Sequence, residues 1–381
     1  MIMREIIYAD NAATTKLNIE AFEAMKPFLI EDYSNPSQPY FFSKKSKRAI
    51  NEARKTIAAC INAKPEEIYF TSGGTESDNW AIKCFSNRTD VKTIITSSIE
   101  HHAVLNSCKN SNASVEYLKV NNQGEVELST LKSCFEKPVD CISSCHSRLV
   151  SIMLVNNEIG TVQNIKGLAS IAHENHCYFH TDAVQAVGHI KIDVKDLDID
   201  MLSASAHKFN GPKGIGFLYI KKGTLITPYN DGGSQEMGMR AGTENVAAII
   251  GMAKALELNT SLIDEHTKYI RQLENALLSN LKNRNINFIR NGSNNRVPGN
   301  ISLSFPGFEG EALLHRLDLM GVCVSTGSAC DSVNTQVSHV LKAINLDKKY
   351  ALGTIRISIN QDNTIEEINK ITDSLIKIIR S

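Results

Sequence analysis

The feature that constrains the fold most is an alternation of short apolar runs with helical patterns between residues 68 and 220. The run from Val150 to Val155 is almost entirely apolar, which is typical of a parallel strand buried on both faces. Comparable runs begin at Ile68, Thr93, Cys177, Met201 and Ile215. Strands separated by helices favour an α/β fold, in which helices cover both faces of a mainly parallel sheet.

The pattern changes towards the end of the chain. A long helical pattern covers residues 244–283, and the strands and helices beyond it are those of a smaller α+β unit. The 381 residues are enough for two packed units. We therefore expect a large domain over residues 16–255 and a small domain formed by residues 1–15 and 256–381.

Composition argues against several classes of protein. Lys and Arg together number 41, as do Asp and Glu, so nothing in the net charge favours binding to nucleic acid or an anionic membrane. No apolar run reaches the ~20 residues of a membrane span, and residues 1–6 lack the layout of a signal peptide. Nine cysteines without a C-x-x-C pair indicate reduced thiols and no metal site, so we expect a cytoplasmic protein.

A lysine near the middle of the chain stands where a cofactor could bind. The stretch Ser205-Ala206-His207-Lys208 ends an apolar run and precedes a turn that contains glycine. A lysine at a strand end, flanked by hydroxyl and imidazole groups, suits an aldehyde cofactor that carries a phosphate. Most lysines near turns are simply solvated, so this stretch needs support from the rest of the chain.

Three other stretches supply that support. Thr71 to Glu76 places two glycines and a threonine between a strand and a helix, a geometry that binds phosphate, although a plain turn before a helix would look the same. Asp182 and Gln185 follow a strand, where they could bond the ring nitrogen and phenolic oxygen of the cofactor. His101 could stack on the ring. Singly, Asp182 could be a helix cap and His101 a surface residue, but together these residues indicate pyridoxal 5′-phosphate.

A cysteine in a small-residue loop is the candidate nucleophile. Cys330 follows Ser325-Thr326-Gly327-Ser328-Ala329, where a thiolate can form and move. Cys323, by contrast, alternates with two valines in a strand and is expected to be buried and inert. A loop-borne thiol beside a cofactor that activates amino acids indicates attack on the substrate, and an incidental exposed cysteine is the alternative.

Seven motifs in this order resemble those of the cysteine desulfurases of the class V aminotransferase group, the NifS/IscS-like enzymes that supply sulfur for iron–sulfur clusters. The resemblance runs from about Tyr8 to the final helix. The motifs are Asp10 to Thr15, Thr71 to Ser77, Glu100-His101, Val155 to Gly160, Asp182 to Gln185, His207-Lys208 and Gly327 to Cys330.

The resemblance implies a fold-type I pyridoxal-phosphate enzyme that acts as a homodimer. Lys208 would carry the cofactor and move the proton, Asp182 and Gln185 would bond the ring, and His101 would stack on it. The phosphate and the rest of the cofactor would be held by Gly74, Thr75, Asn157, Ser205 and His207, and by Thr243 of the partner subunit. Arg356 would bind the substrate carboxylate, helped by Asn35 and Asn157.

The resemblance also implies the reaction. Cys330 would attack the sulfur of L-cysteine, leaving L-alanine and a persulfide on Cys330 for a sulfur-acceptor protein such as an iron–sulfur scaffold, and the persulfide could contact a cluster transiently. Two departures from the family pattern stand out: Tyr40 replaces a histidine, and Asp331 follows the nucleophile. Two alternatives stay open: a pyridoxal-phosphate aminotransferase or selenocysteine lyase that does not depend on Cys330, and a catalytically idle regulatory relative, which these departures would allow.

Overall fold

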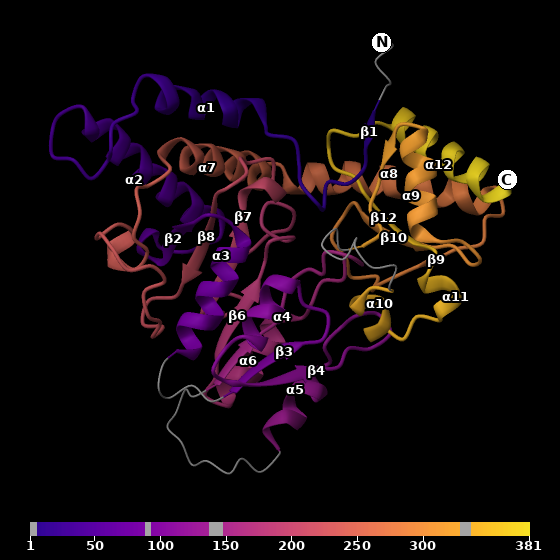
Figure 1. The fold of residues 1–381 in the computed structure, drawn as a ribbon, viewed down its shortest axis with the longest axis horizontal. Helices are drawn as coiled ribbons and strands as arrows, with labels where there is room; N and C mark the ends of the chain where they lie inside the picture. Colours follow the sequence, from indigo (N-terminus) through magenta and orange to yellow (C-terminus); the bar gives the residue numbers. More distant parts are fainter. Residues whose placement is uncertain (1–5, 88–92, 137–147, 328–336) are drawn as a thin grey trace.

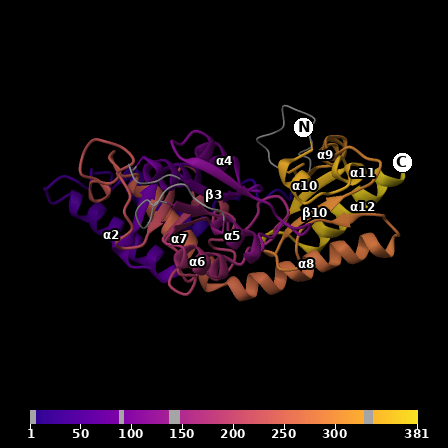
Figure 2. The same ribbon diagram turned by 90° about the horizontal axis from the view of Figure 1, so that it is seen from below.

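The computed structural model describes residues 6–87, 93–136, 148–327 and 337–381. Two lobes lie side by side in both views (Figures 1 and 2). The larger lobe surrounds a seven-stranded sheet, and the smaller one surrounds a three-stranded sheet packed on long helices.

The large sheet has the order β2-β8-β7-β6-β5-β3-β4. Among the described strands, β8 runs antiparallel to both of its neighbours, and the remaining pairs are parallel. The strands are β2 (Ile68–Thr71), β3 (Thr93–Ser97), β4 (Ser114–Leu118), β5 (Arg148–Ser151), β6 (Tyr178–Asp182), β7 (Met201–Ser205) and β8 (Gly216–Ile220). The expected mainly parallel α/β sheet is therefore confirmed.

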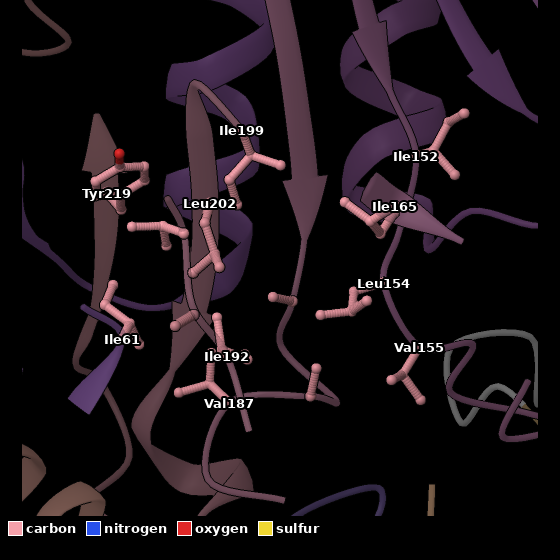
Figure 3. Close-up of a cluster of buried hydrophobic side chains, with 14 of the residues drawn as sticks. Ile61, Ile152, Leu154, Val155, Ile165, Val187, Ile192, Ile199, Leu202 and Tyr219 are labelled. Atoms are coloured by element: carbon pink, nitrogen blue, oxygen red, sulfur yellow. The ribbon is translucent and has the colours of Figure 1, made fainter. Parts of the chain in front are cut away.

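Alternating side chains of this sheet enter two separate cores. Val150 and Leu202 pack with helices α2 (Ser43–Cys60), α6 (Ile165–Glu174) and α7 (Val246–Ser261), in a cluster of which Figure 3 shows a part. Leu149 and Met201, one residue earlier in each strand, pack with η2 (Trp80–Cys84) and α4 (His102–Lys109) on the opposite face. A period of two explains this division, because successive side chains of a strand point to opposite faces.

The helices of the large lobe begin and end where local side chains favour it. Asn18 caps the first helix, because its Oδ1 accepts hydrogen bonds from the N–H groups of Glu20 and Ala21. The helices are α1 (Ile19–Ile30), α2 (Ser43–Cys60), α3 (Gly74–Asn79), η2 (Trp80–Cys84), α4 (His102–Lys109), α5 (Leu128–Phe135), α6 (Ile165–Glu174) and α7 (Val246–Ser261).

The smaller lobe is an antiparallel sheet of order β12-β10-β9, with the parallel pair β1 and β11 beside it. Its core includes Phe305, Ile301 and Leu375, each fully buried. The elements are β1 (Ile7–Tyr8), α8 (Ile263–Asn283), β9 (Ile289–Arg290), β10 (Asn300–Ser304), α9 (Gly310–Leu319), β11 (Val322–Cys323), α10 (His339–Ala343), α11 (Lys348–Ala351), β12 (Thr354–Ser358) and α12 (Ile365–Arg380). The predicted division into residues 16–255 and the remainder stays a prediction.

Two predicted elements differ from the structure. The single helix over residues 244–283 is wrong, because the chain bends by 72° between α7 and α8, and Leu262 separates them. The strand predicted over 150–155 ends at Ser151, although Ile152 and Leu154 still donate backbone hydrogen bonds to His180 and Asp182. Hydrophobicity marks burial, but it does not mark where a helix bends or a strand stops.

Within the described residues, no single helix is long and apolar enough to cross a membrane. Helices α7 and α8 meet the length and composition test only when taken together across their bend.

Candidate active site

The carboxyl ends of two neighbouring parallel strands position the site. Asp182 is the last residue of β6, and Ser205 is the last residue of β7. A 3-10 turn, η3 (Ala206–Lys208), follows β7 directly and carries Lys208 to the same edge of the sheet. A cavity of about 270 Å³ lies there. In open α/β sheets this edge is where ligands bind.

Most of the residues predicted from the sequence line this one cavity. They are Gly74, Thr75, His101, Asn157, Asp182, Gln185, Ser205, His207, Lys208 and Arg356. They come from both lobes, because Arg356 lies on β12 and most of the others belong to the large sheet or the loops at its edge. Their roles remain predictions, but their convergence is a property of the fold.

Lys208 is held by the segment before α1. Its Nζ donates hydrogen bonds to the carbonyl oxygens of Ala12, at 2.7 Å, and Ala13, at 2.8 Å. The Gln185 Nε2 donates to the same Ala12 oxygen at 2.9 Å. The amine of Lys208 is therefore fixed at the cavity wall by two carbonyl groups.

Two buried carboxyl groups lie at the cavity. Burial raises the pKa of Asp182 to about 6, against the Val184 N–H and the Lys208 ammonium, which both lower it. Burial and the charge of Asp182 also raise the pKa of Asp78 well above its usual range. Asp78 Oδ1 has no hydrogen-bond partner in the described part of the chain. Because adjacent buried carboxylates repel, one negative charge is the favoured state of this pair.

The imidazole groups at the cavity are neutral. Burial, followed by the charge of Lys208, lowers the pKa of both His101 and His207 to about 4. His101 accepts a hydrogen bond from the Ala103 N–H through Nδ1, which fixes its ring at the start of α4. His207 Nδ1 lies 3.1 Å from the Thr14 hydroxyl. Uncharged rings suit stacking and hydrogen bonding better than charge pairing.

The glycine turn before α3 is packed tightly against the sheet. A Cβ on Gly74 would lie 2.5 Å from Val184 Cγ2, and one on Gly216 would lie 2.7 Å from the Gly73 Cα. Gly73 itself has φ of 149°, which L side chains rarely adopt. The glycines therefore bring the main chain of this turn close to the cavity.

The residues present fit pyridoxal 5′-phosphate. Lys208 offers a primary amine, and Asp182 offers a buried carboxyl group for a ring nitrogen. Thr75, Ser205 and His207 offer hydroxyl and imidazole donors to a phosphate.

Arg356 lines another part of the cavity and forms an ion pair with Asp10, which is not among the lining residues. Arg356 is 3% exposed, and its Nη2 donates to Asp10 Oδ1 at 2.8 Å. Its Nη1 donates to the Asn157 carbonyl at 2.9 Å, while its Nε is buried without a partner among the described residues. This guanidinium can bind a carboxylate in the cavity.

Two predicted residues lie outside the lining of the cavity, and a third falls outside the described residues. Asn35 lies outside its lining, and its Oδ1 accepts from the Ser37 N–H. Thr243 is exposed and lines a separate cavity of about 230 Å³ together with Arg240. Cys330, like Asp331, lies outside the described residues.

Sequence reasoning missed several residues of the site. It gave no role to Asp78, to the carbonyl groups of Ala12 and Ala13, or to Asp10. One signal for Asp78 was available: it stands four residues after Gly74, hence on the same side of α3. No local pattern pairs Asp10 with Arg356, which are 346 positions apart.

Comparisons with known proteins show the family of the chain. The family model described as aminotransferase class-V matches residues 7–371. A relative from Dictyoglomus turgidum named cysteine desulfurase IscS is 49% identical over 99% of this chain and 95% of its own. A Bacillus subtilis protein named putative cysteine desulfurase IscS 1 is 40% identical over 99% of both chains.

Solved structures show the same fold. A NifS-like protein superposes with a TM-score of 0.90 at 35% identity, covering 98% of this chain and 99% of its own. A structure described as SspA in complex with cysteine superposes with a TM-score of 0.80 at 35% identity, covering 92% and 98%.

Proposed function

The chain belongs to the class V aminotransferase family and is a cysteine desulfurase, and we propose that it works with pyridoxal 5′-phosphate held at Lys208. The observation that carries this proposal is the single cavity lined by Lys208, buried Asp182 and Arg356. An amine, a ring acid and a carboxylate-binding cation are what a pyridoxal-phosphate site for an amino acid requires. The substrate is L-cysteine, and the products are L-alanine and a persulfide.

We assign a task to each of the predicted residues. When bound, the cofactor supplies an electron sink for the substrate. Lys208 holds the cofactor through its amine and moves a proton at the substrate Cα, while Asp182 holds a proton on the ring nitrogen. Gln185 bonds the phenolic oxygen, and His101 stacks on the ring. Gly74, Thr75, Asn157, Ser205 and His207 complete the cofactor site.

The substrate is oriented by the smaller lobe. Arg356 binds the α-carboxylate, with Asn35 and Asn157 assisting. Cys330 attacks the sulfur of L-cysteine, so an S–S bond forms as the bond between sulfur and Cβ breaks. The described residues on both sides of segment 328–336 lie near the cavity. Ser325 pairs its backbone with Arg356, and His339 Nε2 lies 3.0 Å from the Glu100 carbonyl, beside His101.

We further propose a cytoplasmic homodimer in which Thr243 of the partner subunit reaches the phosphate. Thr243 is exposed and does not line the Lys208 cavity of its own chain, which supports this arrangement. The acceptor of the persulfide is a protein such as an iron–sulfur scaffold. Sedimentation of the holoenzyme at micromolar concentration should give a dimer, and a monomer with full activity would contradict this part of the proposal.

The nucleophile is tested by exchanging one cysteine at a time. Cys330→Ala should abolish formation of L-alanine from L-cysteine while the protein keeps its cofactor absorbance. Cys323→Ala is the matched control. Cys323 is half-buried and not fully buried as expected, but partial burial and then the charges of Asp318 and Asp10 raise the pKa of its thiol and favour the protonated form. Undiminished sulfide release by Cys330→Ala would instead favour an enzyme that does not depend on this cysteine.

The cofactor lysine is tested in the same way. Lys208→Ala should lose both turnover and the yellow absorbance of the holoenzyme. Lys213→Ala changes an exposed lysine five residues later and should keep both. Persistence of absorbance and turnover in Lys208→Ala would assign the cofactor to another lysine, and a wild-type protein that takes up no cofactor would indicate a catalytically idle relative.

A further inference from the structure

Arg356 lines the cavity and forms an ion pair with Asp10, and within the described part of the chain its guanidinium has few other partners. Asp10 Oδ1 and the Asn157 carbonyl each accept one hydrogen bond from Arg356, at 2.8 and 2.9 Å. The side chain of Arg356 is 3% exposed and that of Asp10 is 19% exposed. The guanidinium is therefore buried with one compensating negative charge, and it keeps its Nε–H unpartnered among the described residues.

The backbone fixes this pair in advance. Ser358 N donates to the Ala9 carbonyl at 2.7 Å, and Asn11 N donates to the Ser358 carbonyl at 3.0 Å, so Asp10 is held beside β12. Arg356 belongs to β12 itself and pairs with Ser302 of β10. Neither main chain can move away without breaking these hydrogen bonds, so the sheet keeps the two residues side by side.

A substrate carboxylate changes the balance of charge at Arg356. Without substrate, Asp10 compensates the buried cation, which would otherwise be costly to bury. When a carboxylate binds, two negative charges lie near one guanidinium, and they repel each other in a medium of low dielectric constant. Asp10 therefore opposes the group that Arg356 attracts.

We propose that Asp10 is a positioning residue that holds Arg356 and competes with the α-carboxylate of the substrate and product for it. This inference rests on the proposed function, because it takes Arg356 as the residue that binds the carboxylate. Its consequence is weaker binding of amino acids and faster release of L-alanine. Asp10 thus keeps the site from being blocked by its own product.

The decisive variant is Asp10→Asn. Its side-chain oxygen can still accept the hydrogen bond from Nη2, but the negative charge is gone. The holoenzyme is titrated with L-alanine and with ethylamine, which is L-alanine without its carboxylate, and the cofactor absorbance reports binding. We expect the dissociation constant of L-alanine to fall about tenfold in Asp10→Asn, by Coulomb repulsion across a partly buried site, while that of ethylamine stays the same. The KM of L-cysteine should fall with it, without a rise in kcat.

Two results would overturn the inference: an unchanged or higher dissociation constant for L-alanine, or a parallel change for ethylamine. Asp10→Glu keeps the charge and should retain the wild-type ratio of the two constants, which also covers the case in which Asp10→Asn does not fold. Two other results would contradict the proposed function itself. A wild-type holoenzyme that binds no L-alanine, or an Arg356→Gln variant that binds it as tightly as wild type, would remove Arg356 from the carboxylate site.

Discussion

The two sides of the cavity bury polar groups in different ways. On the cofactor side, burial shifts the pKa values of Asp182, His101 and His207 towards their uncharged forms. On the substrate side, Arg356 meets the opposite charge of Asp10 at 2.8 Å. A charged ligand should therefore bind favourably on the cofactor side, because it supplies the missing partners. The substrate side is already compensated, so a ligand there has to compete.

Loss of the ring acid on the cofactor side should reduce turnover most. Asp182→Asn keeps the shape of the side chain but cannot hold a proton on the ring nitrogen, so turnover should fall about 10³-fold, within the range of acid–base contributions. Cofactor absorbance should remain, because Lys208 is intact. Steady-state kinetics of the holoenzyme measure the change. Activity within tenfold of wild type would show that Asp78 or another group can replace Asp182.

The second effect concerns the substrate side. Arg356→Lys keeps the charge but loses the planar, two-pronged donor, so the KM of L-cysteine should rise roughly 30-fold. The affinity for ethylamine, which has no carboxylate, is the internal control and should not change. A KM equal to that of wild type would mean that charge alone, and not the guanidinium shape, binds the carboxylate.

The stability of the protein should depend on pH through Glu100, the residue before His101. Burial raises the pKa of Glu100 to about 8, although Ser97 and the Met153 N–H bond its carboxylate and lower it. The folded protein thus keeps this proton up to about pH 8, whereas the unfolded chain loses it near the ordinary value of 4.5. Stability should therefore decline as pH rises between these values, by on the order of 2 kcal/mol from this group.

The measurement is urea unfolding of wild type and Glu100→Gln, at intervals between pH 5 and about 8.5. The neutral variant should have a flatter profile than wild type. Identical slopes would show that Glu100 is ionised in the folded protein.

The smallest effect lies outside both sides of the cavity and sets a baseline. A hydrogen bond to Asp200, opposed by burial and helped by Asp198, raises the pKa of His173 above its usual value. A histidine whose pKa is higher in the folded protein stabilises the fold fully below its pKa in the unfolded chain. This contribution is lost as pH rises through the pKa of the folded protein. His173→Gln should remove less than about 1 kcal/mol of stability at pH 6 and almost none at pH 9. A larger loss at pH 9 would point to packing instead.

The sequence was most informative where function needs several residues within a short stretch. Lys208 follows Ser205 and His207 directly, and Asp182 precedes Gln185 by three positions, so one strand end places each set. The family could be inferred because these stretches occur in a fixed order. The α/β sheet followed from the apolar runs, which mark strands buried on both faces.

What could not be predicted depends on contacts between distant segments. The carbonyl groups that hold Lys208 belong to Ala12 and Ala13, nearly 200 positions earlier, and alanine side chains carry no signal of such a role. The bend between α7 and α8 lies at Leu262, within a continuous helical pattern. No proline or glycine stands at that position to mark it. Charge compensation, as between Asp10 and Arg356, is visible only once the sheet brings both residues together.

The pairing of Asp10 with Arg356 also bears on how the protein is made. The two residues are 346 positions apart, so tens of seconds pass between their synthesis at ordinary elongation rates. β6 and β7 with their helices can pack before β12 leaves the ribosome. Asp10, by contrast, cannot pair with Arg356 until β12 has been made. A nascent chain would thus acquire its cofactor pocket first and its ability to recognise an amino acid last.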